Sequence, residues 1–199
     1  MARAFLSDTL DRLGGLAVRR FVVFSPVEMQ EQFATLAGGR FELVAQTAGQ
    51  LGQRLAVFFT HMLAGGAEKV VVVGSDSPGL PIEYVERAFT ALDSHDVVIG
   101  PAMDGGYYLL GCRSKLPPVF DGIDWGSNRV LMQTVACLDA AWRLAVLPPW
   151  YDVDRPDDWA MLAGHIAALR RAGEDPGMPH TEALVREIGI SVGDCGVGK

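Results

Sequence analysis

Apolar residues recur along the chain in two alternating patterns, one typical of helices and the other of buried strands. KVVVVG at 69–74 and DVVIG at 96–100 are almost continuously apolar, as expected for strands that are buried on both faces. Between such runs, apolar residues three or four positions apart form single helical faces, as in Leu51, Leu55 and Phe58. This pattern predicts helices at 4–17, 26–37, around 51–62, 81–93, 128–141, 156–172 and near 181–188, and strands at 20–25, 41–46, 69–74, 96–100, 106–111 and 142–148.

Strands and helices that alternate in this way are typical of an α/β fold. We therefore predict a three-layer α/β/α architecture with a mostly parallel sheet and helices on both faces. The length of 199 residues fits one ordinary domain, so we predict a single domain over 1–199. Its C-terminal tail, from 173 to 199, is expected to carry the last short helix.

Composition and charge exclude several classes of function. The formal net charge is −7, and basic residues cluster no further than the pairs Arg19-Arg20 and Arg170-Arg171, which argues against nucleic acid and anionic membranes as partners. The N-terminal MARAFLSDTLDRL predicts an amphipathic helix with acids in it rather than a signal peptide, and no apolar run reaches membrane-spanning length. Three widely separated cysteines without a CxxC pair suggest neither a zinc site nor disulfides, so we expect a cytoplasmic protein.

Three loops that carry aspartate follow predicted strands. GSDSPG carries Asp76, PAMDGG carries Asp104 and PPWYDVD carries Asp154. Because ligands of open α/β sheets lie beyond the carboxyl ends of the strands, we expect these acids to share one edge of the sheet. Mg²⁺ typically binds one or two carboxylates together with substrate phosphates, so the three loops are candidates for a metal site.

Each of these features also has a purely structural interpretation. Asp76 could accept backbone N–H groups in a turn, and Asp154 could cap the helix that begins at Pro156. Gly105-Gly106 could form a tight hairpin turn, and Trp125 could belong to the core. Taken together, three acidic loops at one edge of a sheet favour a site. The terminal GVGK is not expected to bind phosphate, because no helix follows it.

Four segments occur in an order and spacing that resemble a known family: VVVVGSDSPGLP, DVVIGPAMDGGYYLLG, FDGIDWGSNRVLMQT and LPPWYDVDRPDDW. They resemble a bacterial glycosyltransferase-like family, the radical-SAM/selenodomain-associated transferases, which have a GT-A (nucleotide-diphospho-sugar transferase) fold. The chain is more distantly similar to the molybdenum-cofactor and phospholactate guanylyltransferases. The resemblance covers almost the whole chain. It implies a glycosyl- or nucleotidyltransferase that uses Mg²⁺ or Mn²⁺ and a nucleotide-activated small-molecule donor.

The same resemblance implies roles for individual residues. Asp76 matches the acid that holds the metal after the central strand, and Asp154 matches a second metal-binding position, although Arg155 stands where threonine is usual. Asp104 opens the acid-Gly-Gly-Tyr segment that lines the pocket near the sugar or acceptor. Asp76 and Asp104 are therefore the catalytic candidates, and Asp76 and Asp154 the metal ligands. The remaining candidates for nucleotide or substrate binding are Ser75, Ser77, Pro78, Gly105, Gly106, Tyr107 and Trp125.

One departure from the family concerns the start of the chain. Family members begin with a strand and a PxPGxxKTRL-like loop before a helix similar to AFLSDTL, whereas Met1 falls inside that helix here. We therefore expect the first strand, a neighbour of FVVF at 21–24, to be missing from this sequence. Either the natural gene extends upstream of Met1, or the chain closes the gap by direct strand pairing or as a homodimer. Because the loop would hold nucleotide phosphates, the alternative function is a catalytically inactive GT-A-like binding module.

Overall fold

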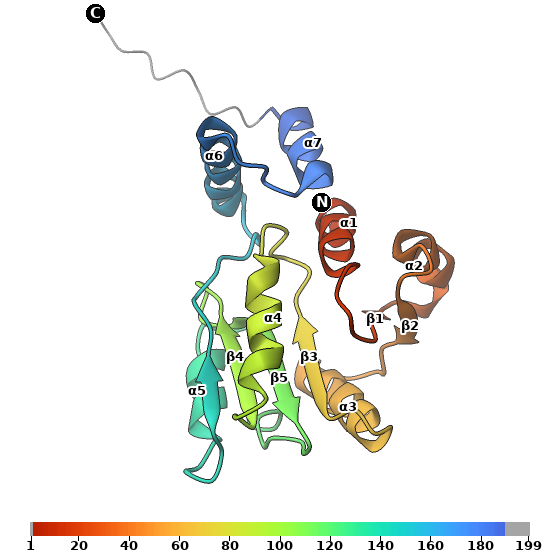
Figure 1. The fold of residues 1–199 in the computed structure, drawn as a ribbon, viewed down its shortest axis with the longest axis vertical. Coiled ribbons are helices and arrows are strands. Elements are labelled where there is room, and N and C mark those ends of the chain that lie inside the picture. Colours follow the sequence, from red (N-terminus) through yellow and green to blue (C-terminus); the bar gives the residue numbers. More distant parts are fainter. Residues whose placement is uncertain (1, 190–199) are drawn as a thin grey trace, which may run out of the picture.

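The strands form two separate sheets in the computed structural model, which describes residues 2–189 (Figure 1). The helices are α1 (Ala2–Leu13), α2 (Gln30–Ala37), α3 (Leu51–Ala64), α4 (Ile82–Ala91), α5 (Val130–Ala136), α6 (Pro156–Ala172) and α7 (Pro179–Glu187), with a 3-10 helix η1 (Val27–Met29). The strands are β1 (Phe21–Phe24), β2 (Glu42–Ala45), β3 (Lys69–Val73), β4 (Val97–Pro101), β5 (Tyr107–Arg113) and β6 (Leu144–Val146). The terminal GVGK and Cys195 lie outside the described residues.

The larger sheet has the strand order β3-β5-β4-β6. β4 and β6 are parallel, whereas β5 runs antiparallel to both β3 and β4. The smaller sheet consists of β1 and β2, which are parallel. The predicted α/β class with alternating strands and helices is therefore confirmed, with β5 as the strand that runs against its neighbours.

Helices cover both faces of the larger sheet, so its strands are buried on both sides. In β4, Val97 and Ile99 pack in a cluster with Phe59 of α3, whereas Val98 packs on the opposite face with Val85 of α4. All three β4 side chains are fully buried. This arrangement explains why DVVIG is continuously apolar rather than alternating.

Three helices from the two ends of the chain pack together above the sheets (Figure 1). Asp8 of α1 is fully buried, and its carboxylate accepts the backbone N–H groups of His180 (3.0 Å) and Thr181 (2.7 Å) in the first turn of α7. Phe5 of α1 packs against Trp159 of α6, with ring centroids 5.3 Å apart. A carboxylate at a helix N-terminus is favourable because it satisfies free N–H groups, so Asp8 holds α7 onto α1.

The structure corrects several predicted boundaries. The first helix ends at Leu13 rather than at 17, because Gly14 and Gly15 follow and glycine disfavours helix continuation. The helix predicted at 128–141 is confined to α5, and the strand predicted at 142–148 is confined to β6. Direct pairing across the expected gap is also wrong, because β1 and β3 belong to different sheets in the described residues. No helix in the described part of the chain is both long and apolar enough to cross a membrane.

Candidate functional site

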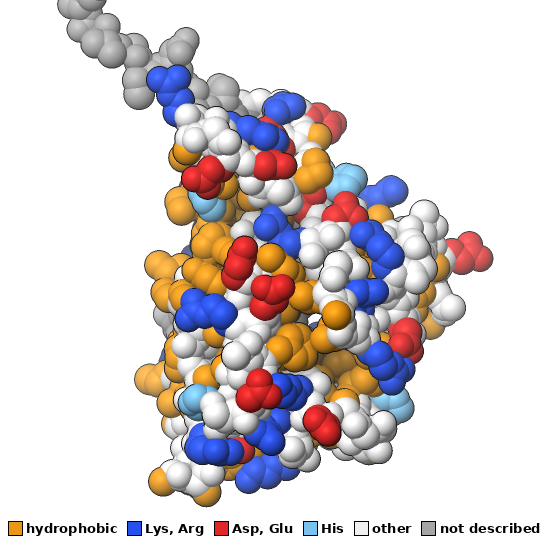
Figure 2. All heavy atoms as spheres, viewed as in Figure 1, with side chains coloured by type: hydrophobic (Ala, Val, Ile, Leu, Met, Phe, Trp, Pro, Cys, Tyr) orange, Lys and Arg blue, Asp and Glu red, His pale blue; other side chains and the backbone are white. Residues whose placement is uncertain are grey.

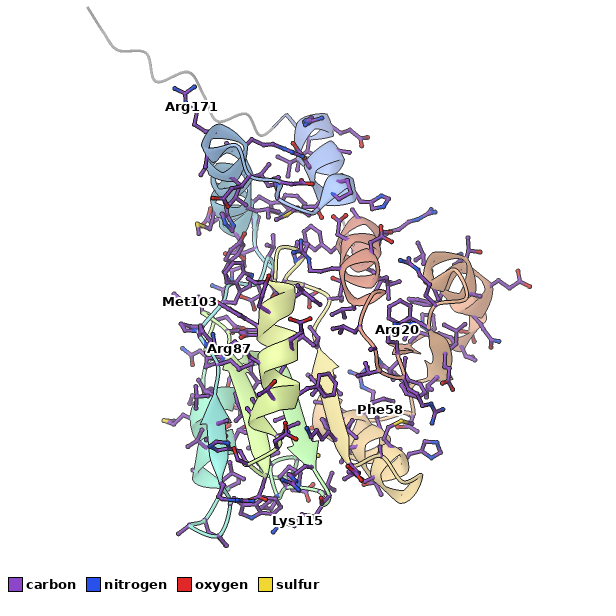
Figure 3. All side chains as sticks on the ribbon, in the orientation of Figure 1. Arg20, Phe58, Arg87, Met103, Lys115 and Arg171 are labelled. Atoms are coloured by element: carbon purple, nitrogen blue, oxygen red, sulfur yellow. The ribbon has the colours of Figure 1, made fainter. Side chains whose placement is uncertain are left out.

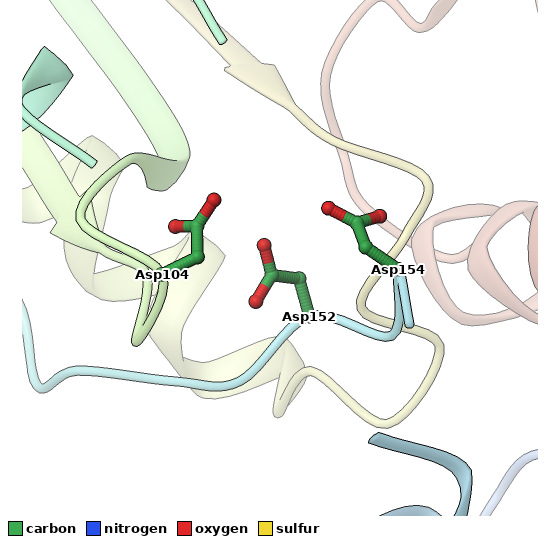
Figure 4. Close-up of side chains that lie close together, drawn as sticks. All are labelled: Asp104, Asp152 and Asp154. Atoms are coloured by element: carbon green, nitrogen blue, oxygen red, sulfur yellow. The ribbon is translucent and has the colours of Figure 1, made fainter. Parts of the chain in front are cut away.

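Three aspartates meet where β4 and β6 end (Figure 4). Asp104, Asp152 and Asp154 each offer a carboxylate oxygen, and these oxygens lie within 4.8 Å of one another. The parallel pairing of β4 and β6 continues past the strand ends, since Met103 donates its N–H to the carbonyl of Trp150 (3.1 Å). This continuation brings the loop of Asp104 beside the loop of Asp152 and Asp154.

Asp152 is a site residue that the sequence analysis did not select. Asp152 lies between β6 and α6, in a segment that is neither helix nor strand. Val153 is buried, with 6% exposure, whereas the carboxylates of Asp152 and Asp154 both lie beside that of Asp104 (Figure 4). The signal was the DVD spacing itself, in which two acids two positions apart flank a buried valine.

Asp104 sits in the hairpin that joins β4 to β5. Its Oδ1 accepts the N–H of Gly106 (2.7 Å), and Gly105 has a positive φ of 94°. A Cβ on Gly105 would lie 2.2 Å from the carbonyl oxygen of Asn128, so only glycine fits between the hairpin and that loop. The hairpin interpretation is therefore correct, and the same turn also carries Asp104 into the acid cluster.

The helix-cap interpretation of Asp154 is wrong. Asp158, in the first turn of α6, accepts the backbone N–H groups of Asp154 (3.0 Å) and Arg155 (2.7 Å). With Asp158 in that role, the side chain of Asp154 faces the other two acids instead of the helix (Figure 4).

Like charges dominate the electrostatics of the cluster. Partial burial, followed by the negative charge of Asp104, raises the pKa of Asp152 to about 6. Partial burial also raises the pKa of Asp154, with further contributions from the charges of Asp76 and Asp104, and only Arg155 opposes this. The folded chain therefore holds several carboxylates together at an electrostatic cost, which a bound cation would relieve.

Asp76 lies beside this cluster but outside the group of three. It is exposed at the end of β3, its carbonyl accepts the N–H of Val153 (2.9 Å), and Ser75 donates to its carboxylate (3.3 Å). Ser77 and Pro78 of the same turn are buried, so their side chains shape the turn rather than line an open surface. Their predicted contact with a ligand stays a prediction, as does metal binding by Asp76.

Tyr107 and Trp125 pack on the side of the sheet that α3 covers. Their rings meet edge to face, with centroids 6.2 Å apart, and both border the cluster that contains Phe59. The indole N–H of Trp125 points to the carbonyl oxygen of Phe120 (3.4 Å). This geometry favours the core interpretation of Trp125, and its role in ligand binding remains untested.

Residues 9–127, more than half of the chain, match a family described as uncharacterized proteins conserved in bacteria, DUF2064. The chain belongs to the DUF2064 family. A curated relative of this DUF2064 protein is the 3-phospho-D-glycerate guanylyltransferase of Phenylobacterium zucineum (strain HLK1). The two are 34% identical over 186 residues, which cover 86% of this chain and 81% of the relative.

The chain is also similar to solved structures. A protein from Desulfovibrio desulfuricans G20, described as a candidate nucleotide-diphospho-sugar transferase, is 34% identical, with a TM-score of 0.80 over 94% of this chain and 84% of its own. A CMP:2-keto-3-deoxy-manno-octonic acid synthetase (TM-score 0.56, 10% identity) covers 82% of this DUF2064 chain and 88% of its own. The match to a cytidylyltransferase from Leptospira borgpetersenii serovar Hardjo-bovis (TM-score 0.54, 13% identity) covers 92% of this chain and 82% of that protein's chain. These last two likenesses concern the fold alone. The predicted similarity to guanylyltransferases and nucleotide-sugar transferases is confirmed at family level, and the radical-SAM association stays a prediction.

Proposed function

We propose that this DUF2064 protein is a metal-dependent nucleotidyltransferase that joins a nucleoside monophosphate to a small phosphorylated acid. The observation that carries the proposal is the cluster of Asp104, Asp152 and Asp154 in a chain similar to a 3-phospho-D-glycerate guanylyltransferase over most of its length. The sequence left glycosyl and nucleotidyl transfer open. The activity of that relative favours nucleotidyl transfer, with guanosine triphosphate as the first donor to test.

The chemistry of the three side chains fits a divalent cation. At a metal–oxygen distance of about 2.1 Å, octahedral ligand oxygens lie about 3 Å apart when adjacent and about 4.2 Å apart when opposite. The carboxylate oxygens here lie within 4.8 Å of one another, so small side-chain rotations bring them to that spacing. Asp104, Asp152 and Asp154 would hold Mg²⁺ or Mn²⁺, and Asp76, whose charge contributes to the raised pKa of Asp154, would bind a water of the same ion or a second ion.

The transfer conserves atoms and electron pairs. An acceptor phosphate oxygen forms a bond to the α-phosphorus of the nucleoside triphosphate, and the bond from that phosphorus to pyrophosphate breaks. Pyrophosphate leaves with the electron pair of the broken bond. A divalent ion at this site supplies positive charge next to the phosphate oxygens, where negative charge develops. The acids position that charge, and nothing in the site requires one of them to act as a nucleophile.

Pyrophosphate release tests the proposal directly. The purified chain is mixed with Mg²⁺, 3-phospho-D-glycerate and each nucleoside triphosphate in turn, and pyrophosphate is measured. We expect release that requires both Mg²⁺ and the acceptor, and a loss of about 100-fold or more in each of Asp104→Asn, Asp152→Asn and Asp154→Asn. Asp139→Asn is the matched control, because Asp139 is exposed beyond α5 and its Oδ1 accepts only the N–H of Ala141 (2.8 Å).

The same assay separates the remaining functions. Glycosyl transfer, suggested by the description of the Desulfovibrio relative, would release a nucleoside diphosphate from a nucleotide sugar and no pyrophosphate. A catalytically inactive binding module would release neither product. Nucleotide binding that Mg²⁺ does not strengthen, together with equal behaviour of the three variants and Asp139→Asn, would contradict a metal site at the acid cluster.

A further inference from the structure

The strand β6 forms an open edge of the larger sheet, at the end opposite β3. Its strand partner within residues 2–189 is β4 alone, so the other side of β6 has no neighbour there. We call this side the β6 edge. Figure 2 shows apolar side chains gathered along this side of the molecule, at the left of the view. An exposed apolar edge of this kind is a template for pairing with another strand.

The peptide groups of Leu144 and Val146 point away from β4. The carbonyl of Arg143 accepts the N–H of Val97 in β4 (3.2 Å), and Leu147 donates its N–H to a β4 carbonyl (2.9 Å). Along a strand, alternate residues direct their peptide groups to the same side, so the residue between these two bonded positions also faces β4. The N–H and C=O groups of Leu144 and Val146 therefore lie at the β6 edge and have no strand partner in the described part of the chain.

The side chains around the β6 edge are apolar and exposed. Val146 is 62% exposed although it belongs to a strand, and Met103, 73% exposed, projects from the same side of the molecule at the end of β4 (Figure 3). Leu144 packs in one cluster with Leu131 of α5, so α5 lies beside β6 on one face of the sheet. The exposed large apolar residues of this region are Met103, Met132, Val135 and Val146.

Charged side chains protect the outer strand of the smaller sheet but not β6. Edge strands of soluble proteins commonly carry charges that oppose pairing with another chain. β2 has such a charge in Glu42, which binds Arg19 (2.9 Å). β6 consists of Leu-Ala-Val and has none, and Arg143, which precedes it, is held by Asp96 next to β4 (3.2 Å). The lack of protection indicates that the β6 edge is covered in the native protein.

We propose that the β6 edge pairs with the β6 edge of a second copy of this chain, so that a homodimer joins the two larger sheets into one. The two strands run antiparallel, and the two-fold axis passes beside Ala145. Leu144 of each copy then lies opposite Val146 of the other. Every outward N–H and C=O group of these two residues gains a partner, because residues opposite each other in such a pair exchange both hydrogen bonds. A surface that matches itself in this way fits the commonest symmetry of homo-oligomers.

The backbone selects this register over its neighbours. Two other registers would also bring outward groups together, one centred on Leu144 and the other on Val146. The first places Trp142 opposite Val146, and the N–H of Trp142 is already bonded within its own turn (3.0 Å). The second places Pro148, which has no N–H, opposite Leu144. The register centred on Ala145 leaves these two unsuited residues opposite each other and satisfies both residues of β6.

The charge and the size of the contact are compatible with a second copy. The two Arg143 residues would lie four positions apart along the paired strands, or about 13 Å, which exceeds the screening length of about 8 Å at physiological salt. Stable interfaces bury about 800 Å² on each partner, and a strand of three residues is too short to supply this area. The exposed Met132 and Val135 of α5 therefore have to contribute to the contact.

The first test is the mass of the chain in solution, and it does not depend on the proposed function because no turnover is measured. At micromolar concentration, light scattering after gel filtration should give twice the 21.4 kDa of one chain. Val146→Lys should give the monomer, because it places a charge inside the contact. Val57→Lys is the matched control, since Val57 is 48% exposed on α3, and it should stay dimeric. A monomeric wild type, or the same mass for both variants, would overturn the proposal.

Proline substitutions test whether the contact uses the backbone. Val146→Pro removes an N–H that points away from β4, whereas Ala145→Pro removes one that faces β4. Ala145→Pro should lower the urea midpoint below that of Val146→Lys. Val146→Pro should match the midpoint of Val146→Lys and raise the dissociation constant of the dimer at least about tenfold, because each copy loses a hydrogen bond. A folded Val146→Pro protein with an unchanged dissociation constant would contradict strand pairing.

Cross-linking tests the register. Ala145 would face Ala145 of the partner in a non-hydrogen-bonded pair, with Cα atoms about 4.5 Å apart, a separation that a disulfide can span. Ala145→Cys should therefore form a cross-linked dimer under mild oxidation at least about tenfold faster than Val57→Cys. The wild type, with its three native cysteines, gives the background rate. Cross-linking of Ala145→Cys at the rate of Val57→Cys would overturn the proposed pairing.

Discussion

Replacement of Asp152 by asparagine should stabilise the metal-free protein while it removes activity. The pKa of Asp152 is raised from 3.8 to about 6, first by burial and then by the charge of Asp104. A folded pKa above the unfolded value means that the charged form is disfavoured in the folded state. The free energy of unfolding should therefore fall as the pH rises from about 4 to about 6, and it should stay at the lower level above that range.

The size of this effect follows from the same pKa. A difference of about two between the two states corresponds to about 3 kcal/mol in full. Asp152 is partly exposed, and solvent screens its neighbours, so about 1 kcal/mol is the realistic gain for Asp152→Asn at pH 7 or above. For a chain of this length, that gain raises Tm by about 2–4 °C.

The assay is urea unfolding of both proteins in EDTA between pH 4 and 8. The variant and the wild type should be nearly equal at pH 4 and should separate by pH 6.5, whereas Asp139→Asn should follow the wild type throughout. Addition of Mg²⁺ should then stabilise the wild type more than Asp152→Asn. A variant that is less stable than the wild type by the same amount at every pH would show that Asp152 has a structural role and would refute the reasoning.

Two further predictions concern the scaffold. Gly105→Ala should cost about 3 kcal/mol of unfolding free energy, because the new Cβ would clash with the backbone of Asn128 and the residue would also be strained by its positive φ. Gly122→Ala is the control, since Gly122 also has a positive φ but lies in open space, and it should cost only about 1 kcal/mol. Equal losses of stability in urea unfolding would contradict the steric argument. Asp8→Ala should cost about 3 kcal/mol, because it leaves the buried N–H of Thr181 and the partly buried N–H of His180 without their acceptor. Limited proteolysis should then release α7, and an unaltered cleavage pattern would show that α7 is held by other contacts.

The sequence predicts well at which edge of the sheet the site lies, but it predicts less well which residues form the site. Asp104 and Asp154 could be selected because their loops follow strands, and the structure does bring them together. Asp152 could not be selected together with Asp154, because the sequence does not show that Val153 is buried and that both acids lie beside Asp104. The role of Asp158 at α6 was equally hidden, because Asp154 and Asp158 are both suitable helix-capping residues by type.

The α/β fold class could be predicted from the pattern of apolar residues, but the separation of the strands into two sheets could not. Periodicity reports whether a segment is buried on one face or two, and DVVIG fits its observed position between α3 and α4. KVVVVG has the same signal, yet β3 has β5 as its only strand partner in the described residues, and Val71 and Val73 remain partly exposed. An apolar sequence indicates that a strand is buried on both faces, but it does not indicate which other strand pairs with it.

Asp76 and the acid cluster are held by different parts of the fold, and this difference determines how they should be tested. Asp104, Asp152 and Asp154 are positioned by β4, β5 and β6, so their mutual geometry does not depend on the side chain of Asp76. Asp76 follows β3 and is tied to the cluster through its backbone, because its carbonyl accepts the N–H of Val153, between the two acids of the DVD segment. Metal binding by the three acids should therefore persist in Asp76→Asn, and a loss of turnover in that variant with metal binding intact would assign the Asp76 side chain to the substrate side of the site.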